Sequence, residues 1–242
     1  MIELTLVRSP PMGRRKFKKI VERPQKSPNP RITLFSEVTF PERFFEKDFS
    51  EFLSSINLPE NTYAFFGAFV AQEKLEAEKS LFKMLFDEGF DKFAKYEFFN
   101  NGVLIGNNYI QRYKKEICTN LDSKMRSQVK GMISGIEYLP CFDASKKQIK
   151  FPKLFLDKKE LEFRVCADIT CGTTNTPDLV LCPAHFLFYP RERSQESLGN
   201  TPLIVNDVNK FMPIYYQNRS RHGITAPSAI KSQGIQLSYI HF

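Results

Sequence analysis

A strict alternation of apolar and polar side chains is the feature that most restricts the fold of this chain. Between residues 161 and 169 every second side chain is apolar, namely Leu161, Phe163, Val165, Ala167 and Ile169. A period of two residues is typical of a β-strand with one buried face. Further strands are predicted at residues 153–156, 178–189, 203–208, 211–216 and 234–242. Residues 131–242 are therefore predicted to be β-rich, and Pro183 predicts an edge or bulged strand over residues 178–189.

Another strand is predicted well before this β-rich half. Residues 31–40 alternate cleanly and stop at Pro41, whereas residues 43–130 place Phe, Leu and Tyr side chains at helical spacing. A strand separated from the others by helices has to pair with the later sheet. We therefore predict one α+β domain over residues 31–242, in which a helical insertion at 43–130 interrupts an OB-like antiparallel β-barrel.

The positive charge of the chain is concentrated near its N-terminus. The net charge is +8, and the segment from Arg8 to Arg31 holds nine Lys and Arg residues and one acid, Glu22. The rest of the sequence is neutral. Five prolines in the same segment, without apolar periodicity, predict a basic, extended arm over residues 1–30. Such an arm favours a polyanionic partner, because cations that neutralise phosphates release counterions.

Composition excludes several classes of protein. The hydrophobic content of 42% is sufficient for a core, and no apolar run reaches the ~20 residues of a membrane span. Five cysteines at irregular spacing do not resemble a disulfide framework. We therefore expect a reducing, cytoplasmic location and no membrane partner.

An aromatic and cationic cluster near the C-terminus is a second candidate for nucleic-acid contact. It consists of Tyr215, Tyr216, Arg219 and Arg221. Aromatic rings that stack bases, next to guanidinium groups that bind phosphates, suit a single strand. The alternative is a strand that buries one of the two tyrosines, beside ordinary loop arginines.

Cysteine and histidine side chains supply a further candidate site. Cys166, Cys171, Cys182 and His185 lie within twenty residues and belong to the ligand types that bind zinc. Their spacing lacks a Cys-x2-Cys knuckle, and Cys166 lies inside a predicted strand. We therefore interpret them as buried free cysteines and predict neither a metal nor a cofactor.

Motifs for catalysis are sparse. The sequence holds three histidines, and it contains no phosphate-binding glycine loop, no nucleophile elbow and no His-Glu-x-x-His motif. Glu162 and Asp178 suggest a metal-dependent nuclease core, but the lysine expected beyond them is replaced by Arg193 and Ser194. We therefore predict that the chain is not an enzyme and keep a nuclease as an alternative.

Three segments resemble the T7-type phage single-stranded DNA-binding protein family. They are the strand at residues 31–42 that leads into a helix, the turn and strand at 139–151, and the closing strands at 211–242. The resemblance implies an OB-fold replication protein that binds single-stranded DNA.

Together these patterns predict a non-catalytic nucleic-acid-binding protein, with single-stranded DNA in phage or plasmid replication as the favoured ligand. The alternative from another class is a structural subunit of a viral or ribonucleoprotein assembly, in which the basic arm contacts RNA or other protein subunits. The residues predicted to bind nucleic acid are Arg14, Arg15, Lys16, Lys18, Lys19, Tyr215, Tyr216, Arg219 and Arg221.

Overall fold

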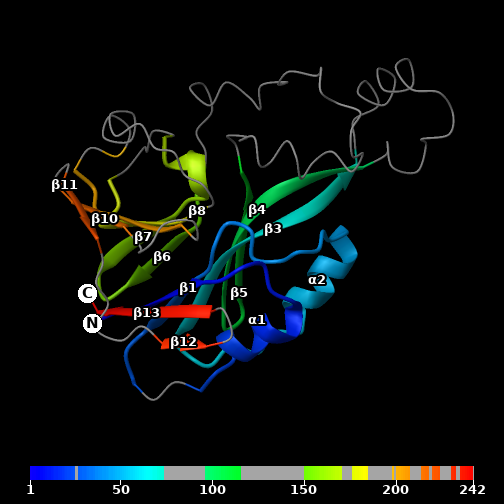
Figure 1. Ribbon diagram of the computed structural model, residues 1–242, viewed down its shortest axis with the longest axis horizontal. Coiled ribbons are helices and arrows are strands. Elements are labelled where there is room, and N and C mark those ends of the chain that lie inside the picture. Colours follow the sequence, from blue (N-terminus) through cyan, green and yellow to red (C-terminus); the bar gives the residue numbers. More distant parts are fainter. Residues whose placement is uncertain are drawn as a thin grey trace, which may run out of the picture.

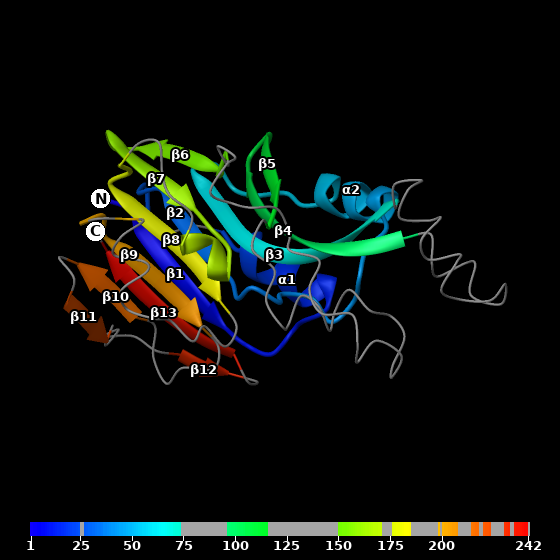
Figure 2. The ribbon, with the colours of Figure 1, turned by 90° about the horizontal axis from the view of Figure 1, so that it is seen from above.

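Two mixed β-sheets packed face to face form the centre of the molecule, and two helices cover the outer face of one of them (Figure 1). The computed structural model describes residues 1–24, 27–73, 96–115, 150–170, 176–184, 198, 200–207, 214–217, 220–223, 230–232 and 235–241. The view from above in Figure 2 shows the strands of the two sheets running in roughly the same direction.

The first sheet has seven strands in the order β12-β13-β1-β2-β3-β4-β5. Their bounds are β12 Ile230–Ser232, β13 Ile235–His241, β1 Glu3–Arg8, β2 Arg31–Leu34, β3 Thr62–Glu73, β4 Tyr96–Gly106 and β5 Tyr109–Lys114. β1, β2 and β3 are parallel, and the flanking pairs are antiparallel. The first and last described strands, β1 and β13, thus lie side by side.

The second sheet has six strands in the order β11-β10-β9-β8-β7-β6. Their bounds are β11 Ser220–Gly223, β10 Ile214–Gln217, β9 Leu203–Asp207, β8 Leu179–Ala184, β7 Lys159–Phe163 and β6 Lys153–Leu156. The parallel strands β7, β8 and β9 lie at its centre. Read from β6 to β11, neighbouring strands pair in the order antiparallel, parallel, parallel, antiparallel, antiparallel. The first sheet has the same order of pairings from β13 to β5, so the two sheets share one topology.

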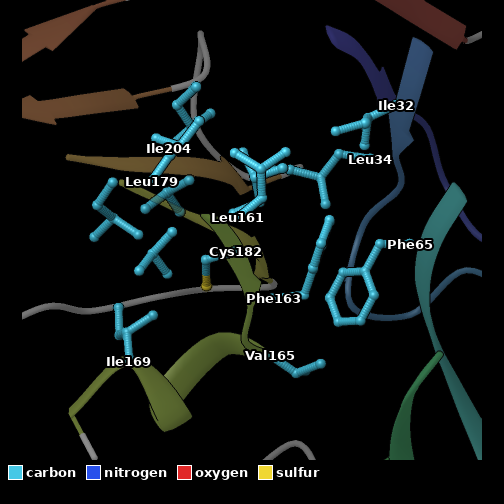
Figure 3. Close-up of a cluster of buried hydrophobic side chains, with 14 of the residues drawn as sticks. Ile32, Leu34, Phe65, Leu161, Phe163, Val165, Ile169, Leu179, Cys182 and Ile204 are labelled. Carbon is cyan, nitrogen blue, oxygen red and sulfur yellow. The ribbon is translucent and has the colours of Figure 1, made fainter. Parts of the chain in front are cut away.

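A hydrophobic core fills the space between the two sheets. Side chains of β2 and β3, such as Ile32, Leu34 and Phe65, face Leu161 and Phe163 of β7 (Figure 3). The Phe65 and Phe163 rings lie 5.0 Å apart. β8 is buried along its whole length, so it reads as a nearly continuous apolar run.

A second core lies between the first sheet and the helices α1 (Arg14–Val21) and α2 (Glu46–Ser54). Phe17 of α1 lies between Phe35 and Phe66, with ring centroids 4.6 and 4.8 Å away. Phe52 of α2 lies 5.4 Å from Phe40. This phenylalanine cluster fixes both helices on the sheet.

The prediction of a basic, extended arm is wrong. Residues 1–24 supply the central strand β1 and the helix α1, and both are part of the core. The prolines flank α1 and do not interrupt it, since the stretch between Pro11 and Pro24 contains none. The cations of α1 concealed the apolar face that buries Phe17 and Val21.

The helical insertion and the OB-like barrel are also not what the structure contains. Residues 43–130 include α2 but also β3, β4 and β5, and both sheets are open. β3 is buried on both faces along most of its length, so it shows no alternation. In β5 the spacing of four between Tyr109 and Tyr113 fits a strand as well as a helix, because four is a multiple of two.

Several predicted strands are confirmed, namely β6, β9, β10 and β13. β2 is shorter than predicted, and β7 ends at Phe163, before the 3-10 helix η2 (Cys166–Thr170). β8 is not an edge strand despite Pro183, because it lies between β7 and β9. In the part of the chain that the structure describes, no helix has the length and apolar character needed to cross a membrane.

Candidate functional site

Three ionisable side chains meet where three strands end. Glu37 lies three residues beyond β2, Lys115 follows directly after β5, and Cys166 lies three residues beyond β7. The exposed fractions of Glu37, Lys115 and Cys166 are 0%, 4% and 2%. β2 and β5 belong to the first sheet and β7 to the second, so the site lies between the sheets.

A short ion pair forms the polar half of this site. The Lys115 ammonium donates a hydrogen bond of 2.6 Å to Oε1 of Glu37. The Asn100 amide donates to the same oxygen at 3.1 Å, while the Asn100 carbonyl accepts from the Lys115 backbone N–H at 2.8 Å. Asn100 therefore ties both charged residues to β4.

Close backbone approach places Glu37 against the sheet. A Cβ atom at Gly67 of β3 would lie 1.9 Å from the Glu37 carbonyl oxygen and 3.2 Å from Asn100 Oδ1. Only glycine leaves room there, so Gly67 allows the chain after β2 to bring the Glu37 carboxylate to Lys115.

The third member, Cys166, sits at a tight turn. Its φ of 48° lies in the left-handed region, which is uncommon for a residue other than glycine and is associated with functional sites. Burial raises the pKa of its thiol well above the usual value, the neighbouring Glu37 carboxylate raises that pKa further, and Lys115 opposes this. The thiol is within hydrogen-bonding reach of Glu37.

Buried groups support this turn from several sides. The Tyr113 hydroxyl of β5 accepts a hydrogen bond of 2.5 Å from the Val165 backbone N–H. The Cys182 thiol of β8 points to the Cys166 carbonyl at 3.7 Å (Figure 3 shows Val165, Ile169 and Cys182 around the turn). Burial raises the pKa values of Tyr113 and Cys182 well above normal, so both stay protonated near neutral pH.

A thiol, a carboxylate and an ammonium group that meet in this way are able to support covalent catalysis. A buried thiol with a raised pKa is a poor nucleophile by itself and needs an adjacent base. Glu37 is such a base, and the Lys115 ammonium is a donor for negative charge that develops on a carbonyl oxygen.

The structure places the five predicted cationic residues, Arg14 to Lys19, on α1, away from this trio. Arg15 and Lys19 are exposed. Arg14 pairs with Glu42 at 2.6 Å and covers the Phe44 ring at 4.5 Å, and Lys18 pairs with Glu22. The contacts of Arg14 attach the helix to its surroundings, whereas the Lys18–Glu22 pair joins the last turn of α1 to its C-cap residue.

The side chains of the predicted aromatic platform lie outside the described residues. Tyr215 and Tyr216 lie on β10 and Arg221 on β11, and the whole of Arg219 is outside the described residues. Tyr216 pairs with Arg221 across the two strands.

Of the four zinc candidates, Cys166 and Cys182 are described, and both are buried free cysteines. Cys171 and His185 lie outside the described residues. Where side chains are described, no group of three His, Cys, Asp or Glu could hold a metal. The two nuclease carboxylates have other partners, because Glu162 pairs with Arg164 and Asp178 accepts from the Glu160 backbone N–H.

Sequence reasoning did not identify Glu37 and Lys115, and it assigned Cys166 to a strand. One signal was present: Glu37 is the only acid between Arg31 and Phe40, in a run whose other members are apolar, Ser or Thr. A lone buried carboxylate needs a partner, and Lys115 lies too far along the chain to be found without the topology.

Comparison with known proteins bears on the fold. No protein-family model and no curated protein matches the sequence. Among solved structures, the chain is similar to the NitN amidase from Neterenkonia sp. AN1, with a TM-score of 0.54 and 10% identity over 98% of this chain and 92% of that one. A Glu-to-Gln mutant of the Nesterenkonia sp. AN1 amidase, with acrylamide added at its active site cysteine, gives the same values.

A further similar structure is the glutamine-dependent NAD+ synthetase from Acinetobacter baumannii. Its TM-score is 0.57 at 10% identity, and the match covers 99% of this chain but 45% of that one. A mutant of the Nesterenkonia AN1 amidase is described as belonging to the nitrilase superfamily. The fold of this chain is therefore the one seen in nitrilase-superfamily amidases.

These findings correct the earlier interpretation. The resemblance to T7-type single-stranded DNA-binding proteins is wrong, because the neighbours are amidases and a synthetase without an OB-fold. The predictions of a non-catalytic, single-strand-binding role and of a nucleic-acid partner are not retained, because the basic segment forms β1 and α1 and the similar structures are amidases and a synthetase. The prediction that the chain is not an enzyme is also overturned, since these neighbours are enzymes and include amidases with an active site cysteine. The structural-subunit and nuclease alternatives are dropped.

Proposed function

We propose that this protein is a thiol-dependent amidase that hydrolyses the C–N bond of small amides. The observation that carries the proposal is the meeting of a buried thiol, carboxylate and ammonium at Cys166, Glu37 and Lys115. The amidase neighbours support it, because one of them is modified at an active site cysteine.

The first half of the reaction forms a thioester. The Cys166 sulfur attacks the amide carbonyl carbon while its proton passes to Glu37, and Lys115 donates a hydrogen bond to the resulting oxyanion. Glu37 then gives the proton to the departing nitrogen. The C–N bond breaks, and ammonia or an amine leaves.

The second half returns the enzyme to its starting state. Glu37 takes a proton from water, the hydroxide adds to the thioester carbonyl, and Lys115 again faces the oxyanion. The C–S bond breaks, a carboxylic acid leaves, and Cys166 recovers its proton. One carboxylate thus serves as base and acid in turn.

The raised pKa of Cys166 fits this scheme. A thiol that is protonated near neutral pH requires a base in contact with it, and Glu37 is within reach. A free cysteine nucleophile also has to stay reduced, so we place the protein in the reducing cytoplasm.

The test is ammonia release from short aliphatic amides and from glutamine. Butyramide is a ligand of an amidase neighbour, and glutamine is named for the synthetase neighbour, so both belong in the panel. We expect release by the wild type and none above background by the Cys166→Ala and Glu37→Gln variants. Equal release by the wild type and Cys166→Ala would refute the proposal.

A further inference from the structure

A buried arginine forms hydrogen bonds to the turn that carries Cys166. Arg164 is fully buried, and its Nη1 donates hydrogen bonds to the backbone carbonyls of Asp168 at 3.3 Å and Ile169 at 3.4 Å. Both carbonyls belong to η2, the 3-10 helix that begins at Cys166. The side chain therefore reaches forward over the nucleophile and joins the end of β7 to the far side of the turn.

Two neighbours hold the guanidinium in place. Oε1 of Glu162 accepts from Arg164 Nε at 2.7 Å and lies 2.6 Å from Nη2. The Phe151 ring faces the guanidinium carbon at 4.4 Å. A planar group fixed on one edge by a carboxylate and on one face by a ring has little freedom to turn.

The turn needs such support because its backbone is unfavourable. A non-glycine residue in the left-handed region is strained and persists only where its surroundings over-determine it. Inside the turn, the Asp168 backbone N–H donates to the Val165 carbonyl at 3.1 Å. If Cys166 relaxed to an ordinary φ, the carbonyls held by Arg164 would move away from its Nη1.

We propose that Arg164, oriented by Glu162, is a positioning residue that fixes the η2 turn and thereby aims the Cys166 thiol at Glu37 and Lys115. This inference deepens the proposed function and rests on it. Lysine cannot replace the arginine, because a single ammonium cannot bond Glu162 and also reach the two η2 carbonyls.

The experiment compares three variants with the wild type in three measurements. Arg164→Lys keeps the charge, and Glu162→Gln combined with Arg164→Met removes both buried charges together, which is often tolerated where removal of one is not. Arg112→Lys is the matched control, because Arg112 also pairs with a glutamate, Glu46, and lies over a ring, Phe49, on the exposed side of the first sheet. The measurements are melting temperature, kcat and KM for amide hydrolysis, and the rate of Cys166 alkylation by iodoacetamide across pH.

We expect folded Arg164→Lys with kcat lowered about 100-fold, as displacement of a reacting group by about 1 Å can cause. KM should stay near the wild-type value, the alkylation rate should fall, and its pH midpoint should shift as the thiol moves relative to Glu37. The Arg112→Lys control should keep the wild-type melting temperature, kinetic constants and alkylation rate.

Two results would overturn the inference. One is a folded Arg164→Lys or double variant with wild-type kcat and alkylation rate; the double variant decides the matter if Arg164→Lys does not fold. The other is an equal loss in Arg112→Lys. Alkylation remains informative if the wild type hydrolyses no amide: slower Cys166 alkylation in the Arg164 variants would then support the positioning role while the proposed function failed.

Discussion

Two ion pairs of equal length show how differently charge is used in this molecule. Lys115–Glu37 and Arg14–Glu42 both have a nitrogen–oxygen distance of 2.6 Å. The side chains of the first pair are 2% and 0% exposed, and those of the second are 41% and 39% exposed. Arg14 of the exposed pair lies in the most basic segment of the sequence, whereas the buried pair joins residues 78 positions apart.

The difference teaches that local charge density is a poor guide to chemistry here. An exposed pair is solvated and contributes little to stability, while a buried pair has lost its water and acts strongly on anything beside it. The Cys166 thiol is beside the buried pair. The cations of α1 are instead the solvated face of a helix whose other face is the phenylalanine core.

The largest effect that would sharpen this contrast concerns catalysis. Cys166→Ala should lower amide hydrolysis about 10⁴-fold or more, because the covalent route is lost. Neutralising the exposed cations by Arg15→Gln and Lys19→Gln should leave kcat unchanged, because both residues lie on the solvated face of α1 and not beside the buried ion pair. Steady-state ammonia release from both proteins measures the difference, and a comparable loss in the α1 variant would break the comparison.

The next effect concerns stability. Lys115→Met leaves the Glu37 carboxylate buried without its ammonium and should lower the free energy of unfolding by about 3–5 kcal/mol. Arg14→Met at the exposed pair should cost no more than about 1 kcal/mol from the lost ion pair.

Urea denaturation of both variants gives the two values. Combining Glu37→Gln with Lys115→Met should recover part of the stability without recovering activity. Equal losses of unfolding free energy in Lys115→Met and Arg14→Met would contradict the claim that the buried ion pair is the stronger of the two.

A smaller effect is expected at the glycine behind Glu37. Gly67→Ala sets a methyl group against the Glu37 carbonyl and should destabilise the fold by about 1–3 kcal/mol while lowering kcat, because the backbone that carries the carboxylate has to shift. Gly13→Ala, with no atom within 4 Å of the added carbon, is the control; since Gly13 is the N-cap of α1, this change should cost about 1 kcal/mol or less and leave kcat unchanged. Thermal melts and initial rates of both variants would show the difference, and an unaffected Gly67→Ala would mean that Glu37 is not held this tightly.

The smallest effect is a dependence of stability on alkaline pH. The pKa values of Cys166 and Cys182 are raised in the folded state, so the unfolded chain loses these protons first as the pH increases. Their contribution to stability is complete below the unfolded thiol pKa of about 8.5 and is lost above it. Melting temperatures from pH 7 to 10 should therefore fall less steeply for Cys166→Ala than for the wild type, and parallel curves would argue against a buried, protonated thiol.

Much of the β-structure follows from the sequence, but the site does not. The strands at residues 153–156 and 203–207 were readable from short apolar runs, and the closing strand from the alternation of Ile235, Leu237 and Tyr239 with Gln236 and Ser238. β3 was not, since a strand covered on both faces resembles a buried helix segment. α1 was predicted as part of an extended arm because its cations outnumber the apolar side chains that it buries against the sheet.

The trio escaped prediction for a different reason. Glu37, Lys115 and Cys166 come from three separate strands of two sheets, and no local spacing joins them. The left-handed turn at Cys166 interrupts an alternation that continues to Ile169 in the sequence, so pattern alone extended the strand through the nucleophile. Only the pairing of β2, β5 and β7 with their neighbours brings these residues together.

The most direct test of the account is to locate covalent modification after the native protein is incubated with acrylamide. The account predicts one adduct, mapped to Cys166 by peptide mass spectrometry, slowed by butyramide and absent from Cys166→Ala. Modification of other cysteines in the native protein with Cys166 left free would contradict the claim that Cys166 is the nucleophile of this fold.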